Sequence, residues 1–284
     1  MSMARRSGSA QAQVGAVMQG GVILATGEPR RAMSAFLEAA AIAARAGIKP
    51  GQVMGLGNAA ETAIDLGELD VAARALAEAD EIGGGGTLDQ DGVTLCHALL
   101  GVYRGDLVTA HADLDRLEAD RRADWDAVQM TTWFLRTRSA VHLIEGDWAA
   151  ALADARESIA LEASGGNAAN CVWQGVQAAA RLGEADAIAA LLADTAGLRG
   201  EWIDSVRATA EAAVVALHGD AKAGAEAITT VLTDWRDRDF PLDHAFAAGL
   251  ALHVLPPDVV PQADVDAARA YLQQLHAEGI LRLF

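Results

Sequence analysis

The stretch that decides the fold is Ile144-Glu145-Gly146-Asp147, where a glycine and then an acid follow the end of an apolar segment. Glycine can adopt the left-handed conformation that ends a helix, and an acid after it can accept hydrogen bonds from free N–H groups of the next helix. The chain repeats this pattern six times, at Gly27-Glu28, Gly67-Glu68, Gly105-Asp106, Gly146-Asp147, Gly183-Glu184 and Gly219-Asp220. Successive glycines are separated by 40, 38, 41, 37 and 36 residues. A near-constant period of this length indicates an array of helix pairs.

The segment after each glycine carries apolar residues at two fixed positions. A residue that is usually small stands five positions after the glycine, and a residue that is usually larger stands four positions further on. A spacing of four places both on one face of a helix. The pairs are Ala32 and Phe36, Ala72 and Leu76, Ala110 and Leu114, Ala151 and Ala155, Ile188 and Leu192, and Gly224 and Ile228. We therefore expect this face of each second helix to be buried against its neighbours.

The pattern resembles the tetratricopeptide repeat, whose two-helix unit carries Gly-Asp at the turn, Ala and then an apolar residue in the second helix, and Ala again three positions beyond. Ala39 and Ala79 match that last position. The other four repeats depart from it, with Leu117, Ser158, Thr195 and Val231. The period also exceeds the consensus of about 34 residues, and the terminal proline is missing. The resemblance implies an all-α superhelix, or solenoid, of about six helix pairs with longer connections.

The pattern divides the chain into three parts. Residues 1–10 are expected to be a disordered lead-in, residues 11–238 the repeat array, and residues 239–284 a C-terminal capping pair packed on the array. In the last part, Asp243 can begin a helix that Pro256-Pro257 ends, and an amphipathic helix follows. Terminal repeats are often atypical because one of their sides faces water.

Residues 231–284 add a second resemblance. Trp235-Arg236, the stretch Phe240-Pro241-Leu242-Asp243-His244-Ala245 and Ala268-Arg269 are similar to the tail of adenylate-cyclase-like and LuxR-type ATPase regulators of actinobacteria. In those proteins a tetratricopeptide-like region follows a nucleotide-binding domain and senses or recruits a partner. The resemblance implies a protein-interaction or sensor module in signalling or transcription regulation.

Charge and composition exclude several partners. The net charge of −17 repels nucleic acid and anionic membrane surfaces, so neither is an expected partner. No segment reaches the ~18 apolar residues of a membrane span. Arg5-Arg6 and the apolar stretch 14–25 imitate a signal peptide, which leaves export as an alternative, but Gly20 and Gly21 interrupt that stretch. The spacing of Cys96 and Cys171 fits a reducing compartment, and we expect a cytoplasmic location.

No motif supports catalysis, a cofactor or a metal site. Lys49 and Lys222 are followed by Pro50 and Ala223, so neither belongs to a phosphate-binding Gly-Lys-Ser/Thr loop. The spacings His-Glu-x-x-His and Cys-x-x-Cys are absent from the sequence. We therefore expect a noncatalytic protein, with an enzyme whose active site is built from scattered helical residues as the least favoured alternative.

In tetratricopeptide arrays the first helix of each pair lines the concave surface. Counting back from the turn glycines places aromatic, arginine and amide side chains there, namely Tyr103, Trp133, Arg136, Asn170, Trp173, Gln177 and Arg181. Tryptophans would form apolar walls, and arginines would pair with an acidic group. We expect these residues to bind a protein or peptide in the groove. A small molecule inside the superhelix is the alternative ligand, and a core role for the tryptophans is the structural alternative. The oligomeric state is not predicted.

Overall fold

The computed structural model describes residues 9–25, 27–83, 87–119, 128–162 and 166–284. Fifteen helices and no strand occur in these residues, which confirms the expected all-α fold. The expected lead-in falls mostly on residues 1–8, which lie outside the described part, and the first helix begins at Ala10. None of the helices within the described ranges combines the length and apolar character that crossing a membrane requires.

Twelve helices form six consecutive pairs, one pair around each of the turn glycines. The pairs are α2 (Ala10–Leu24) and α3 (Pro29–Arg45), α4 (Lys49–Asp65) and α5 (Leu69–Ile82), α6 (Thr87–Arg104) and α7 (Leu107–Ala119), α8 (Val128–Glu145) and α9 (Trp148–Leu161), α10 (Gly166–Leu182) and α11 (Ala185–Asp194), and α12 (Glu201–Leu217) and α13 (Ala221–Asp237). The number of pairs is the number that the sequence predicts.

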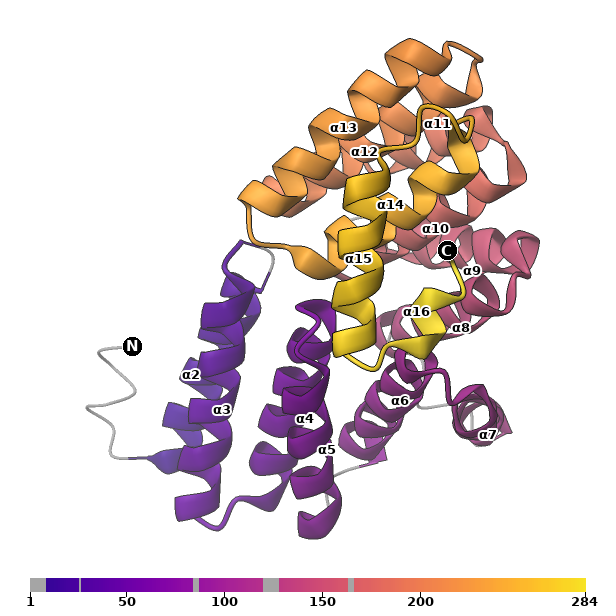
Figure 1. Ribbon diagram of the computed structural model, residues 1–284. Coiled ribbons are helices and arrows are strands. Elements are labelled where there is room, and N and C mark those ends of the chain that lie inside the picture. Colours follow the sequence, from indigo (N-terminus) through magenta and orange to yellow (C-terminus); the bar gives the residue numbers. More distant parts are fainter. Residues whose placement is uncertain (1–8, 26, 84–86, 120–127, 163–165) are drawn as a thin grey trace. The chain divides into compact units, whose positions relative to one another are not determined.

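The chain forms two compact units, Met1–Leu100 and Gly101–Phe284. In the first unit, α2 packs against α3, α3 against α4 and α4 against α5 (Figure 1). In the second unit, the first helices α8, α10 and α12 are neighbours in one layer, and the second helices α9 and α11 contact each other in another. Residues 239–284, which the sequence predicts to form a capping pair on the array, belong to the second unit.

Five of the six turns have the backbone conformation that the glycines predict, whereas Gly27 has no positive φ and the N–H of Glu28 reaches back only four residues, to the carbonyl of Leu24. The φ angles of Gly67, Gly105, Gly146, Gly183 and Gly219 are 74°, 87°, 85°, 75° and 91°. The N–H of the residue after the glycine then reaches back five residues, as from Asp147 to the carbonyl of His142 at 2.9 Å. Asp239 and His276 adopt the same conformation without glycine, with φ of 59° and 52°, at the ends of α13 and of a later helix.

The acids after the glycines behave differently according to their length. The carboxylates of Asp106, Asp147 and Asp220 accept backbone N–H groups three residues further on, at 3.1, 3.1 and 2.9 Å. In Asp106, the hydrogen bonds from Thr109 lower the pKa of the carboxyl. Glu28, Glu68 and Glu184 make no such bond, so the expected cap is wrong for the glutamates. Their extra methylene carries the carboxylate past the helix start, and that of Glu68 pairs with Arg30 instead.

The repeated apolar positions are buried, with one exception. Leu192 is only half-buried, and Leu191 is buried in its place because α11 is short. Small residues at these positions allow close helix contacts. At Gly224 a Cβ atom would lie 2.8 Å from the Cα of Ala216, so α12 and α13 could not approach as they do with a larger side chain there.

Three C-terminal helices complete the second unit: α14 (Pro241–Val254), α15 (Gln262–Gln274) and α16 (Glu278–Leu281). Helix α14 is apolar almost all round, and such a helix is stable only when it is buried. It contacts α10, α12 and α13, and α15 covers another side of it, as Figure 1 shows in yellow. The layer of first helices is therefore covered by the chain's own α14.

Substitutions at two turns measure how much stability the left-handed backbone costs at a residue other than glycine. A Cβ at Gly219 would contact nothing within 4 Å, so Gly219→Ala should lose about 1–2 kcal/mol of unfolding free energy through its backbone alone. His276→Gly should gain up to about 1 kcal/mol, because its exposed imidazole sits on the same strained backbone. Urea unfolding of both variants measures these changes. A loss of stability in His276→Gly would contradict the explanation.

Candidate functional site

The residues expected to line a groove lie mostly in the interior of the second unit. Each of the buried ones is at most 8% exposed: Tyr103, Trp133, Arg136, Trp173, Gln177 and Arg181. Asn170 is half-buried. Phe246 of α14 lies against the rings of Tyr103 and Trp173, with ring centroids 5.9 and 6.5 Å apart. Helix α14 therefore closes the surface on which the sequence suggests a groove.

Trp173 belongs to an aromatic cluster in the core. Its ring centroid lies 5.9 Å from that of Trp235, which is 6.4 Å from Trp202 and 5.9 Å from Phe240. The indole N–H of Trp235 donates to Thr209 at 3.0 Å. The indole N–H groups of Trp133 and Trp173 are buried without an acceptor among the described residues. The structure thus supports the core alternative for Trp173, at the contact between the repeats and α14.

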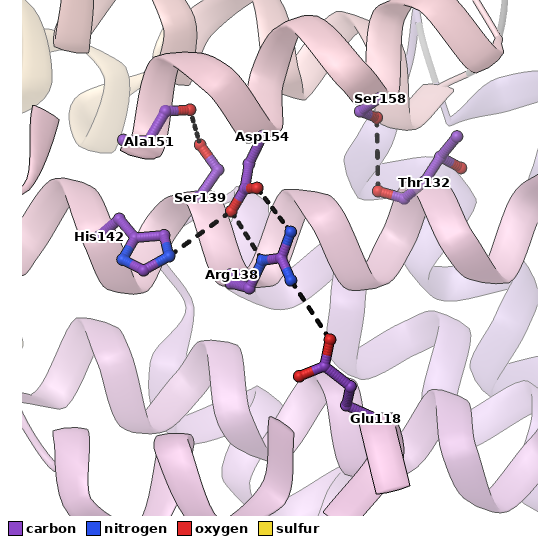
Figure 2. A network of polar contacts seen from close by, with 8 residues as sticks. All are labelled: Glu118, Thr132, Arg138, Ser139, His142, Ala151, Asp154 and Ser158. Carbon is purple, nitrogen blue, oxygen red and sulfur yellow. Dashed lines mark hydrogen bonds and ion pairs between the residues drawn. The ribbon is translucent and has the colours of Figure 1, made fainter. Parts of the chain in front are cut away.

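A second group of polar side chains joins α8 to α9, as Figure 2 shows. Arg138 donates from Nε and Nη2 to the two carboxylate oxygens of Asp154, at 2.9 and 2.7 Å. Glu118 lies 3.6 Å from Arg138, and His142 lies 3.7 Å from Asp154. The hydrogen bonds from Arg138 to Asp154 are the main cause that raises the pKa of the guanidinium. The charges in this cluster compensate each other, so it is a structural clamp between two helices.

Arg181, near the end of α10, has no comparable partner. Its Nη1 donates to the carbonyl and side-chain oxygens of Gln177 at 3.0 and 2.7 Å, and its Nη2 lies 3.4 Å from the carbonyl of Leu283. Its Nε has no hydrogen-bond acceptor among the described residues. Burial lowers the pKa of Arg181 to about 10, and the guanidinium is still charged at neutral pH. It is therefore a buried cation held only by neutral acceptors.

Arg181 lines a pocket of about 470 Å³ in the second unit. The pocket lies where the α8–α9 turn, the end of α10, the end of α14 and the residues after α16 meet. Its lining comprises Leu107, Leu143, Ile144, Glu145, Gly146, Trp148, Arg181, His253, Arg282 and Leu283. Among the residues that the sequence singles out for binding, only Arg181 lines it. The structure also places Trp148 in the pocket wall, with its ring centroid 5.9 Å from that of His253.

The buried thiol of Cys171 is not activated as a nucleophile. Burial raises the pKa of the Cys171 thiol to about 11, against the opposing effects of Ser158 and of the Arg136 charge, so the thiol is protonated at neutral pH. In the part of the chain that the structure describes, no group of three or more His, Cys, Asp or Glu side chains could hold a metal ion. The pocket therefore offers binding groups, and its lining contains no Ser, Cys or Thr nucleophile.

Breaking the Arg138–Asp154 clamp should cost the protein far more stability than breaking an exposed ion pair. Arg138→Met leaves the buried carboxylate of Asp154 without its main partner and should cost about 2–3 kcal/mol. Arg116→Met, whose arginine is 60% exposed beside Asp113, should change the stability by less than about 0.5 kcal/mol. Chemical denaturation measures both values. Equal losses of unfolding free energy in the two variants would show that the Arg138–Asp154 contact stabilises the fold no more than the exposed pair does.

His253 should make the protein less stable in acid. Burial is the main cause that lowers its pKa, the Arg181 charge adds to it, and the hydrogen bond to the carbonyl of Leu283 opposes both. The unfolded chain therefore takes up this proton at a higher pH than the folded one, and stability falls as the pH drops through 6.5 and below. The Tm of His253→Gln should fall less between pH 7.5 and pH 5 than that of the parent. His276→Gln, outside the pocket, is the control and should follow the parent.

Comparisons with known proteins add no functional assignment. No protein-family model and no curated protein matched the chain. The resemblance to tetratricopeptide repeats and to actinobacterial regulators therefore stays a prediction from the residues that carry it. The function has to be argued from the pocket and from the buried charge that lines it.

Proposed function

We propose that this protein is a noncatalytic sensor module that binds a small molecule inside its second unit and signals through a protein partner or an attached effector. The observation that carries the proposal is the pocket lined by the buried guanidinium of Arg181. Its volume of about 470 Å³ falls within the range of about 300–1,000 Å³ that is typical of small-molecule sites. Its lining combines apolar side chains with charged ones, and sites for small molecules use polar groups of this kind to fix the orientation of the ligand.

The burial of the inner face favours a small molecule over a peptide. A peptide in the groove would need access to Trp133 and Trp173, which are both buried, and α14 packs on α10 and α12 of that layer. Protein partners would then contact outer surfaces of the helices. Recruitment of a protein by such surfaces is common in helical repeat arrays.

The wider role follows from the resemblance and from the cysteines. We place the module in bacterial signalling or transcription regulation because residues 231–284 resemble the tails of such regulators. A cytoplasmic location agrees with Cys96 and Cys171, which are both buried free thiols. An enzyme is the weaker alternative because the pocket lining contains no Ser, Cys or Thr nucleophile.

Thermal unfolding with a library of metabolites tests the proposal. A ligand present at about one hundred times its Kd stabilises the folded state by ~2.7 kcal/mol, which corresponds to a rise in Tm of roughly 5–10 °C for a unit of this size. At least one compound should raise the Tm in a saturable manner and be recovered unchanged. A library without any stabilising compound would contradict the sensor proposal. Turnover that is lost in Arg181→Gln would contradict the noncatalytic part.

A further inference from the structure

We infer that the pocket binds a small organic monocarboxylate with an apolar body, whose carboxylate pairs with Arg181. The inference rests on the proposed sensor function and names the chemical class of its ligand. Three properties of the pocket support it, namely the uncompensated charge, the geometry of the guanidinium and the lining.

The first property is the uncompensated charge of Arg181. The chain carries 39 acidic and 22 basic residues, yet no carboxylate of a described residue forms an ion pair with this guanidinium. Burial is the sole cause that shifts its pKa, downward, and no carboxylate opposes the shift. Arg138, by contrast, forms a bidentate ion pair with Asp154 through two hydrogen bonds. A buried cation is costly unless an anion compensates it, and here the anion would come with the ligand.

The second property is the hydrogen bonding of the guanidinium. Nη1 is fully used by Gln177, but Nε has no acceptor and the contact of Nη2 with the carbonyl of Leu283 is long, at 3.4 Å. Nε and Nη2 form one edge of the guanidinium, and a carboxylate matches such an edge with two parallel hydrogen bonds of about 2.8 Å. The carboxylate would replace the long contact with Leu283. Because the residues after α16 supply that carbonyl, ligand binding would act directly on the C-terminal segment.

The third property is the composition of the lining, which fits a monoanion with an apolar body. Leu107, Leu143 and Ile144 and the ring of Trp148 supply apolar surface. The exposed Arg282 and Glu145 also line the pocket with opposite charges, and the carboxylate of Glu145 lies 2.7 Å from the Nε2 of His111. The opposite charges of Arg282 and Glu145 cancel, so the lining keeps one net positive charge, that of Arg181. One carboxylate would neutralise it. A phosphate dianion would demand more cationic groups than the lining offers.

Matched acids and amides test the inference on the unaltered full chain. Calorimetry and tryptophan fluorescence with hexanoate, benzoate and phenylacetate should show saturable binding. Hexanamide, benzamide and phenylacetamide have nearly the same shape without the charge and should bind at least tenfold more weakly. Inorganic phosphate and acetate should bind at least tenfold more weakly than benzoate, since they lack the apolar body.

Variants assign the binding to the pocket. Arg181→Gln should weaken the Kd for the tightest acid at least tenfold, and Arg181→Lys should weaken it by an intermediate factor because an ammonium group cannot form the bidentate pair. Arg116→Gln, on the exposed face of α7, is the matched control and should keep the parental Kd. The comparison of acids with amides remains decisive even if an Arg181 variant does not fold, because it uses the parent protein.

The outcomes separate this inference from the proposed function. Equal affinity for acid and amide, or an unchanged Kd in folded Arg181→Gln, would overturn the carboxylate assignment. Tighter binding of phosphate, or stabilisation of the protein only by neutral metabolites, would also overturn it and leave the sensor proposal standing. A failure of every acid and every metabolite to bind would overturn both.

Discussion

The left-handed backbone at the ends of five of the six first helices is the constraint on which the rest of this structure depends. It lets one helix end with a backbone hydrogen bond across five residues and lets the next helix begin two residues later. Two helices joined so closely must run side by side, and they pack through the small and large apolar residues that follow each glycine at fixed distances. The layers of the second unit, and the pocket built on them, exist because this turn recurs at nearly constant intervals.

Helix α14 adds a second constraint that acts on function. A repeat array usually presents its first helices to a partner, but here an apolar helix of the same chain occupies that layer. Its Phe246 rests on Tyr103 and Trp173, so residues that could have bound a peptide have become core. The pocket of the second unit lies where the ends of α8, α10 and α14 meet.

The fold can be predicted from the sequence better than the site can. The fold depends on residues that are close together in the chain, whereas the site joins residues that are far apart in it. The turns and the buried faces follow from residues within one repeat, and the six pairs could be read from them. Whether an aspartate or a glutamate caps the next helix is also local, although one methylene decides it. The closure of the groove depends on α14, and the pocket joins Trp148, His253 and Arg282 from separate segments. No periodicity relates those residues, so only Arg181 could be predicted.

Arg138 and Arg181 show why burial of a charge is more informative than its position in a repeat. Both arginines lie on first helices of the second unit; Arg181 is buried, and the side chain of Arg138 is 29% exposed. Arg138 meets a carboxylate on the neighbouring helix, so the fold itself balances its charge. Arg181 meets a glutamine side chain and carbonyl groups, which satisfy some of its hydrogen bonds and leave its charge unbalanced. Arg181 therefore keeps an unbalanced positive charge beside the pocket, and the carboxylate of the proposed ligand would neutralise it.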